Sequence, residues 1–451
     1  EICACLVGSE MCIRDSIITM KKNITIYLLL ALACLGLQSC LFQEENYFDD
    51  SSANRATADV NRCSELLKAA PNGWVMEYYI GKDYSLGGIT LLCRFDGQRV
   101  TMASQMSEAD ETVSSLYSVK SEQATMLSFD TYNYLVHYFG QPQGSMSDDP
   151  NGTLGGDYEF IISSASAERI ELKGKKYGNR IVMKALTEDQ TWKQYLTKIK
   201  KVEDDAFFYE YDLLMDGLYT GQMLRSNYTF IVTYYDEIGK VHQKTVPFMF
   251  TADGLRFHEP VTIDGQTMQN FVWKNELISF VCTDEGATGV KLAGVYTAGY
   301  QSYDYYPGTY QMDFYRLNDE TGQLEVASQE VRLLKNEDGK SYWLKGLEYD
   351  ILVMYDKPRG GLSVSPQLLE KVQGGYVYLA MWDVMNDYVL RGESIGLISY
   401  ATTNGIYLVD NGVWMGEVSG FIFGVYNSQE EDAAFIGYTD AVASIRLVKK
   451  Q

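Results

Sequence analysis

The sequence predicts a mostly β protein with two or three antiparallel β-meander units, each barrel-like or sandwich-like, an N-terminal helix and one helix between units. Three observations predict it. Tyr, a favoured strand residue, occurs 35 times and Pro only 8 times. Short apolar segments recur between Asp-Gly and other Gly-rich turns, which are typical of β-hairpins. A chain of 451 residues is also long enough for more than one hydrophobic core.

Residues 20–39 predict export. The segment carries Lys21 and Lys22 at its start and continues into an apolar run over residues 24–37. That run is shorter than the ~20 residues that a membrane-spanning helix needs, and a short apolar run behind a basic start is typical of a cleaved secretory signal. Residues 1–19 contain three Cys without a pattern and resemble a translated sequencing adapter, so we interpret them as a non-native leader.

The end of the signal predicts a lipid anchor in the membrane. Leu37-Gln-Ser-Cys40 resembles the lipobox of bacterial lipoproteins, which implies cleavage before Cys40, lipid on its thiol and an acyl chain on its new amine. More than one acyl chain anchors a protein stably. The alternative is an ordinary cleaved signal with Cys40 as a bystander.

The segment after Cys40 bears on localisation. Residues 40–57 are acidic and polar, and we interpret them as a tether. The acidic residues resemble the surface-export signal of Bacteroidetes lipoproteins. This resemblance implies an outer-membrane protein exposed at the cell surface, with a periplasm-facing position as the alternative.

Residues 58–202 are predicted to form the N-terminal helix and the first β unit. Apolar residues at helical spacing predict a helix over 58–70. Alternating apolar residues on both sides of the DG dipeptide at 96–97 predict a hairpin. TEDQ at 187–190 has the spacing of a capping box, so we expect a helix behind it that ends the first unit.

A second β unit is predicted over residues 203–292. DG dipeptides at 253–254 and 264–265 lie between aromatic segments and predict hairpins. Residues 293–307 contain Gly, Pro and several Tyr, and we interpret them as a junction between units.

Residues 308–451 alternate short strands with turns, which predicts a C-terminal β barrel or sandwich. Within this unit we expect a strand over 413–418. A short helical turn is expected over 365–370.

Net charge and cysteine content argue against several kinds of binding site. The net charge of −22 argues against binding nucleic acid through bulk electrostatics. Outside the leader, the signal and Cys40, the sequence has Cys63, Cys93 and Cys282, which form neither a disulfide framework nor a zinc-ligand spacing. We predict buried thiols, with a Cys63–Cys93 bridge as the alternative, and neither a metal site nor a cofactor.

No motif predicts catalysis. His137, His242 and His258 are not spaced to place two on one helix face, and the sequence has no GxSxG or P-loop motif. His258 and Glu259 follow a predicted strand, where they could cap a pocket or lie in an exposed turn. Carboxylates are too numerous to single out a glycosidase pair. We therefore predict no catalytic residue and no enzyme, with a glycan or peptide hydrolase as the alternative.

Four tyrosines of the junction are candidate ligand contacts. Tyr300, Tyr303, Tyr305 and Tyr306 could form an aromatic platform for a glycan or peptide, because rigid rings give contact area at low entropic cost. Tyr is also a favoured strand residue, and junctions between units are packed with aromatic rings. Structural packing is therefore the alternative.

Three short motifs, together with the lipobox, carry a family resemblance. PNGWVMEYY at 71–79, GGDYEF at 155–160 and DGLRFHEP at 253–260 are similar to Bacteroidetes surface lipoproteins of the "domain of unknown function 4302" family, over roughly residues 40–450. The resemblance implies no activity and no catalytic residue. Such lipoproteins are often encoded beside outer-membrane nutrient-uptake systems, which implies an accessory binding role with uptake proteins as partners. The alternatives are a surface hydrolase and an adhesive or structural surface protein.

Overall fold

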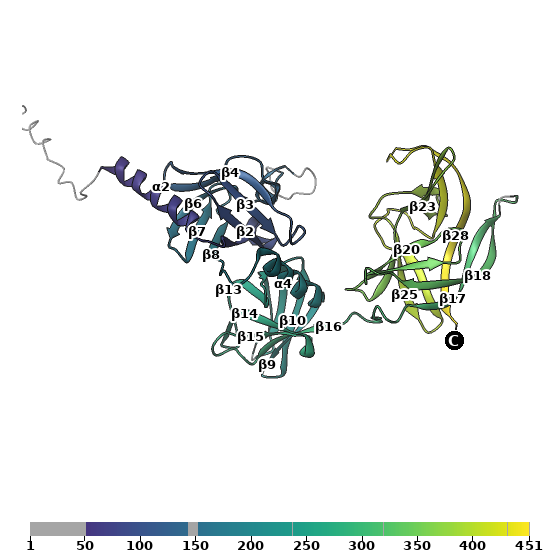
Figure 1. The fold of residues 1–451 in the computed structure, drawn as a ribbon. Helices are drawn as coiled ribbons and strands as arrows, with labels where there is room; N and C mark the ends of the chain where they lie inside the picture. Colours follow the sequence, from purple (N-terminus) through teal and green to yellow (C-terminus); the bar gives the residue numbers. More distant parts are fainter. Residues whose placement is uncertain (1–50, 143–151, 237, 319, 431, 451) are drawn as a thin grey trace, which may run out of the picture.

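The computed structural model describes residues 51–142, 152–236, 238–318, 320–430 and 432–450. Within them the protein is mostly β, as predicted, and forms three barrel-like units in sequence order (Figure 1). The signal and the lipidation candidate Cys40 lie outside the described residues. In the part that is described, no helix is long and apolar enough to cross a membrane.

The first unit is a closed barrel of eight antiparallel strands. Its elements are β1 (Trp74–Ile80), η2 (Lys82–Tyr84), β2 (Gly87–Phe95), β3 (Arg99–Ser104), β4 (Val113–Ser121), β5 (Thr125–Phe129), α3 (Tyr134–His137), η3 (Tyr138–Gly140), β6 (Glu159–Ala165), β7 (Arg169–Gly174) and β8 (Arg180–Ala185). Trp74 of β1 lies opposite Ala185 of β8, which closes the ring. Trp74, Met76 and Tyr78 alternate along β1 and fill the barrel core, so the residues between them face outwards.

Helix α2 (Ser52–Lys68) lies against β4 and β5. It begins at Ser52 and not at residue 58 as predicted, because the side chain of Ser51 accepts a hydrogen bond from the backbone N–H of Asn54 and caps the first turn. Residues 52–57, at the end of the predicted tether over 40–57, are therefore helical. At the other end of α2, the indole N–H of Trp74 donates to the buried Leu67 carbonyl at 2.9 Å and fixes the helix to β1.

Helix α4 (Trp192–Asp205) follows the first barrel, as predicted. Its capping box is formed by Thr191 and Gln194, and the prediction at 187–190 was wrong. Thr191 has the extended backbone of an N-cap, and its side chain accepts from the Gln194 N–H, so the first turn begins after it. Leu196 and Ile199 share one hydrophobic core with the second barrel, which places α4 where the two barrels meet (Figure 1).

The second unit is also a closed eight-stranded barrel. Its elements are β9 (Glu210–Met215), β10 (Leu218–Ser226), β11 (Thr229–Tyr235), β12 (Val241–Phe250), β13 (Gly254–Ile263), β14 (Gln266–Lys274), η5 (Asn275–Leu277), β15 (Ser279–Cys282) and β16 (Val290–Val295). The predicted DG turns join β12 to β13 and β13 to β14. Phe230 stacks on Phe248 in the core with ring centroids 4.3 Å apart. Strand β2 of the first barrel packs along β12, so the two barrels lie side by side.

The C-terminal unit is a barrel with an added sheet. Its strands are β17 (Gly308–Asn318), β18 (Gln323–Lys335), β19 (Ser341–Lys345), β20 (Ile351–Asp356), β21 (Gly361–Val364), β22 (Gln367–Val372), β23 (Gly375–Asp383), β24 (Tyr388–Leu390), β25 (Leu397–Thr402), β26 (Gly405–Asp410), β27 (Gly420–Tyr426) and β28 (Phe435–Lys449). β17 pairs with both β18 and β28 and closes a ring that also contains β19, β20, β21, β25 and β26. Strands β27, β23, β22 and β24 continue from β28 as an extension sheet.

Two predicted elements of this unit were wrong. The segment 365–370 is not a helical turn: β22 begins at Gln367, whose side-chain amide bonds both the N–H and the carbonyl of Leu352 and holds the chain extended. The segment 413–418 is a loop and not a strand, because the indole N–H of Trp414 donates to Asp383 at 3.1 Å and draws it away from the sheet. The predicted junction, 293–307, begins within β16.

Cys63, Cys93 and Cys282 are buried free thiols. The alternative Cys63–Cys93 bridge is therefore not formed. Burial is the main cause that raises the pKa of Cys282 to about 11, so its thiol stays protonated at neutral pH.

Candidate functional site

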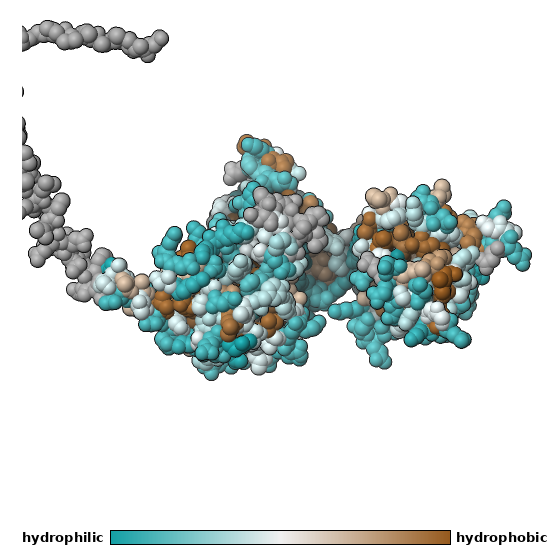
Figure 2. Space-filling view, turned by 90° about the horizontal axis from the view of Figure 1, so that it is seen from above, coloured by the Kyte–Doolittle hydropathy of each residue, from teal (hydrophilic) through white to brown (hydrophobic). Residues whose placement is uncertain are grey.

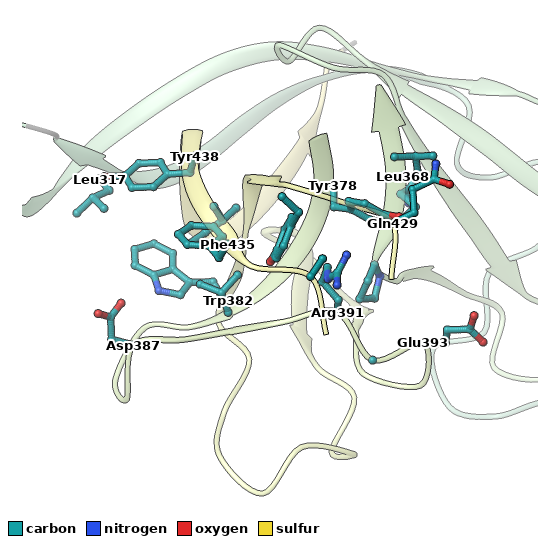
Figure 3. Close-up of a pocket in the computed structure, with 17 residues that line it drawn as sticks. Leu317, Leu368, Tyr378, Trp382, Asp387, Arg391, Glu393, Gln429, Phe435 and Tyr438 are labelled. Atoms are coloured by element: carbon teal, nitrogen blue, oxygen red, sulfur yellow. The ribbon is translucent and has the colours of Figure 1, made fainter. Parts of the chain in front are cut away.

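An open groove runs along the extension sheet of the C-terminal unit (Figure 3). It has a volume of about 1330 Å³ and is lined from β17, β22, β23, β24, β27 and β28 and from the loops on either side of β24 and between β27 and β28. Seen from above, hydrophobic side chains gather on the C-terminal unit, on the side where Figure 1 places β23 (Figure 2). Pockets for small ligands typically measure ~300–1,000 Å³, so this groove has room for a longer ligand.

The groove exists because the extension sheet is apolar on both faces. Along β23, Val377, Leu379 and Met381 point into the barrel core, and the alternate residues Tyr378 and Trp382 line the groove. Strand β27 shows the same alternation, since Phe421 and Phe423 lie in the core and Ile422 and Tyr426 line the groove. A second apolar face without a covering layer is typical of a binding surface.

The aromatic residues of the groove differ in exposure. Trp382 is 4% exposed and packs with Ile422 in the floor. Phe435 is 44% exposed and Tyr438 is 36% exposed, and both come from the first half of β28. Figure 3 shows Tyr438, Phe435 and Tyr378 in a row along the groove. These rings offer faces on which a ligand can stack.

Arg391 fixes one side of the groove. Its guanidinium carbon lies 4.8 Å from the ring centroid of Tyr378 and 4.2 Å from that of Tyr426, within cation–π range of both. Its Nη2 also donates to the carbonyl of Glu430 at 2.6 Å. Because Glu430 belongs to the loop between β27 and β28, Arg391 ties that loop to the aromatic floor.

A buried carboxylate shapes the opposite wall. Asp383, at the end of β23, accepts hydrogen bonds from the backbone and the side chain of Asn386 at 3.1 and 2.9 Å. These bonds, led by that from the Asn386 side chain, hold the pKa of Asp383 below its ordinary value. The turn that results leads through Asp387 into β24 and places the Asp387 carboxylate at the rim.

The polar groups of the rim are mainly acceptors. Asp387 and Glu393 lie at opposite ends of the view in Figure 3, with the aromatic rings between them. Gln429 lies on the loop between β27 and β28. None of the described lining residues is His, Cys, Ser or Lys. The arrangement is suited to stacking and hydrogen bonding with a ligand.

The predicted tyrosine platform lies elsewhere, at the start of the C-terminal barrel. Tyr306 is 1% exposed, and its hydroxyl donates to the Gly360 carbonyl at 2.8 Å. Tyr303 stacks on Tyr342 with centroids 4.7 Å apart, and its hydroxyl donates to the Ser341 carbonyl. These two tyrosines pack as part of the barrel, which is the alternative that the sequence left open.

The other two predicted tyrosines, Tyr300 and Tyr305, are partly or more fully exposed. Tyr300 stacks on Phe207 at 6.0 Å and lies within 3.1 Å of the Tyr355 hydroxyl, so it bridges the second barrel and the C-terminal unit. Tyr305 is 40% exposed and meets Tyr306 edge to face. A ligand role for Tyr300 and Tyr305 stays a prediction.

The histidines do not converge. His137 lies in α3, His242 contacts Asp236 at 2.9 Å, and His258 lies between Tyr79 and Tyr84 with ring centroids 4.4 and 4.0 Å away. His258 is therefore packed in an aromatic cage and neither lines the groove nor occupies an exposed turn. Among the described residues, no group of three or more His, Cys, Asp or Glu is placed to hold a metal.

Two of the three motifs behind the family resemblance meet where the first two barrels touch, and the other is held inside the first barrel. Glu77, from the first motif, is 7% exposed and pairs with Arg256 of the third motif and with Lys184 at 2.8 Å. The Tyr78 hydroxyl accepts from the Asp157 N–H at 2.6 Å and donates to the Asp157 carbonyl at 2.9 Å. These motifs therefore hold the two barrels and their loops together.

Sequence reasoning missed the groove. The signal was present in the segments 376–382 and 420–426, where apolar residues continue without alternation. Such runs indicate strands buried on both faces. The sequence analysis predicts both segments as strands but does not predict which of their two apolar faces stays uncovered.

Comparison with known proteins finds two family models, and the boundary between their matches lies within the second barrel. The model of a family described as a domain of unknown function (DUF4302) matches residues 44–275, which contain the first barrel and most of the second. A second family model (DUF4987), also described as a domain of unknown function, matches residues 283–423. No curated protein matches the chain. A solved structure titled "The Structure of Intact Ap-TbpB (N and C lobes)" is 10% identical, covers 81% of this chain and 67% of its own, and has a TM-score of 0.11, too low to carry an argument. Since the first family model spans more than half of the sequence, the chain belongs to the DUF4302 family.

Proposed function

We propose that this protein is a lipid-anchored, extracytoplasmic binding protein without catalytic activity, and that it serves as an accessory component of an outer-membrane nutrient-uptake system. The observation that carries the proposal is the aromatic groove of the C-terminal unit. Its exposed rings and acceptor-rich rim suit capture of a glycan or peptide. The anchor would be Cys40, which holds the barrels at the cell surface.

The groove favours binding over hydrolysis. Its carboxylates, Asp387 and Glu393, lie at opposite ends of the row of rings in Figure 3. Hydrolysis of a glycosidic bond by a carboxylate pair needs the two groups on either side of one bond. A hydrolase with its site in this groove is the alternative that the first experiment separates.

The first experiment measures the melting temperature of the full chain in detergent with glycans, peptides, haem and Ca²⁺, and assays each mixture for product. A ligand at ~100 times its dissociation constant stabilises the folded state by ~2.7 kcal/mol. A rise in the melting temperature without formation of a reaction product supports a binding protein. A shift with product contradicts the non-catalytic part of the proposal, and no shift with any ligand contradicts the binding role of the groove.

The anchor is tested separately by metabolic labelling with an alkyne fatty acid. Cys40→Ser should abolish the label and release the protein from the membrane fraction, because the acceptor thiol is gone. Cys34→Ser, within the signal, is the matched control and should keep the label. Protease treatment of intact cells then tells surface exposure from a periplasmic position.

A further inference from the structure

We infer that the groove of the C-terminal unit binds a neutral, linear oligosaccharide of several sugar units. This inference rests on the proposed function, since it assumes that the groove is the ligand site. It adds the chemical class of the ligand, which follows from the charges, the polar groups and the geometry of the lining.

The charges of the lining disfavour an anionic ligand. Among the described lining residues Arg391 is the one cation, and its guanidinium is held between Tyr378 and Tyr426 while it donates to the Glu430 carbonyl. Asp387 and Glu393 place negative charge at both ends of the groove (Figure 3). An acidic ligand would meet two carboxylates and a cation that is already engaged.

The position of the groove disfavours an extended peptide. Peptides that add to a sheet are recognised through backbone hydrogen bonds at a free strand edge. This groove lies over the face of the extension sheet, and a sheet face presents side chains. Strand β23, at its centre, pairs with β27 on one side and with β22 and β24 on the other, so its backbone groups are used in the sheet. Within the described residues, free strand edges are present on β22 and β24, at the end of the sheet, so a peptide that added there would not lie over the rings of the sheet face.

The remaining polar groups suit hydroxyls. Asp387, Glu393 and Gln429 make no hydrogen bond or ion pair to another described residue, and their side-chain oxygens accept hydrogen bonds. A sugar has many O–H donors to offer these oxygens, and its C–H faces can stack on Phe435 and Tyr438. The carbonyls of a peptide lying over the same rings would find few donors and lose their hydration.

The size of the groove indicates several sugar units. Its volume of about 1330 Å³ exceeds that of typical small-ligand pockets. The rings of Tyr438, Phe435 and Tyr378 follow one another along it (Figure 3). A linear chain can stack on successive rings and reach a carboxylate at each end, which a single sugar cannot do.

Calorimetric titration of the full chain in detergent tests this inference. The probes are neutral hexasaccharides of glucose, mannose and xylose in several linkages, the corresponding trisaccharides, a hexagalacturonate and hexalysine. Phe435→Ala and Tyr438→Ala are the groove variants. Tyr400→Ala, which removes a 64% exposed ring on β25 outside the groove lining, is the matched control.

We expect a neutral hexasaccharide to bind more tightly than its trisaccharide. Each groove variant should weaken binding by about twofold to about twelvefold, the equivalent of one aromatic contact, and Tyr400→Ala should not. Binding of only the hexagalacturonate or hexalysine, weakened by the groove variants, would overturn this inference and leave the proposed function standing. If a neutral oligosaccharide binds and the groove variants do not weaken that binding, the groove is not its binding site. No saturable binding of any probe would overturn both proposals.

Discussion

Replacing Glu77 by Gln tests whether a buried acid holds the two N-terminal barrels together. Glu77 is 7% exposed and contacts both Arg256, in the second barrel, and Lys184, in the first. Gln keeps the size of the side chain but leaves the two cations without an anion. Removing one partner of a buried pair costs ~3–5 kcal/mol. The Arg256 and Lys184 side chains are 20% and 40% exposed, and solvent screens part of the cost, so we expect a loss of ~2–3 kcal/mol in the free energy of unfolding.

The assay is urea denaturation followed by tryptophan fluorescence, with a double-mutant cycle. Glu77→Gln, Arg256→Gln and the double variant should give a coupling energy of at least ~1 kcal/mol, because the two side chains share one contact. Glu171→Gln is the control, since Glu171 pairs with Arg169 on the exposed surface of the same barrel and should lose ~1 kcal/mol or less. If Glu77→Gln costs no more than Glu171→Gln, or if the coupling is below ~0.5 kcal/mol, the reasoning is refuted.

Three further predictions concern stability. Thr191→Ala removes the N-cap of α4 and should cost ~1 kcal/mol in urea denaturation; an unchanged midpoint would contradict the assigned cap. Phe248→Ala empties a fully buried, stacked position of the second barrel and should cost ~3–5 kcal/mol, so a loss below ~1 kcal/mol would contradict the packing. Burial lowers the pKa of His258 from its ordinary 6.5 in the folded state, so folding favours the neutral ring. The contribution of His258 to the free energy of unfolding is therefore fully present above pH 6.5 and is lost as the pH falls towards the lower, folded-state pKa. The slope is at most ~1.4 kcal/mol per pH unit. His258→Gln should flatten the decline in the urea midpoint just below pH 6.5, and an unchanged decline would contradict this role.

Local patterns predicted the strands well but could not predict how the barrels close. The DG turns at 96–97 and 264–265 fix hairpins between neighbouring strands, because Gly97 and Gly265 adopt the positive φ that such turns need. At 253–254 the Gly is needed for space, since a Cβ on Gly254 would clash with the Phe271 carbonyl oxygen. Closure of the first barrel depends on Trp74 lying opposite Ala185. That contact joins residues far apart in the sequence, and no local pattern encodes it.

Two of the wrong predictions share a physical cause. The segment 413–418 has strand-like residues, but Trp414 donates to Asp383 and holds it as a loop. The segment 365–370 has a helical appearance, but Gln367 bonds the backbone of Leu352 and keeps it extended. In both cases one side-chain hydrogen bond to a distant residue outweighs a weak local preference. Residue type alone left the role of the junction tyrosines open, and Tyr306 is buried because its neighbours in space are barrel residues.

Strand β28 explains why the groove belongs to the C-terminal unit alone among the described barrels. Residues 442–449 pair with β17 and close the ring, and residues 435–443 pair with β27, so that Val442 and Ala443 pair on both sides. Phe435 and Tyr438, in the part that pairs with β27 alone, line the groove. The two parts of β28 meet next to Ser444, which has a φ of 52° and whose N–H donates to the Ser419 carbonyl at 2.7 Å. The pairing of β27 with its part of β28 also contains two register shifts. The first two barrels close without such an extension, and the outward apolar residues Val75, Leu92 and Ala103 of the first barrel are covered by the core that it shares with α4 and the second barrel. Because the groove is built on a strand that is part of a closed barrel, its rings are held by regular structure, which favours precise positioning of a ligand.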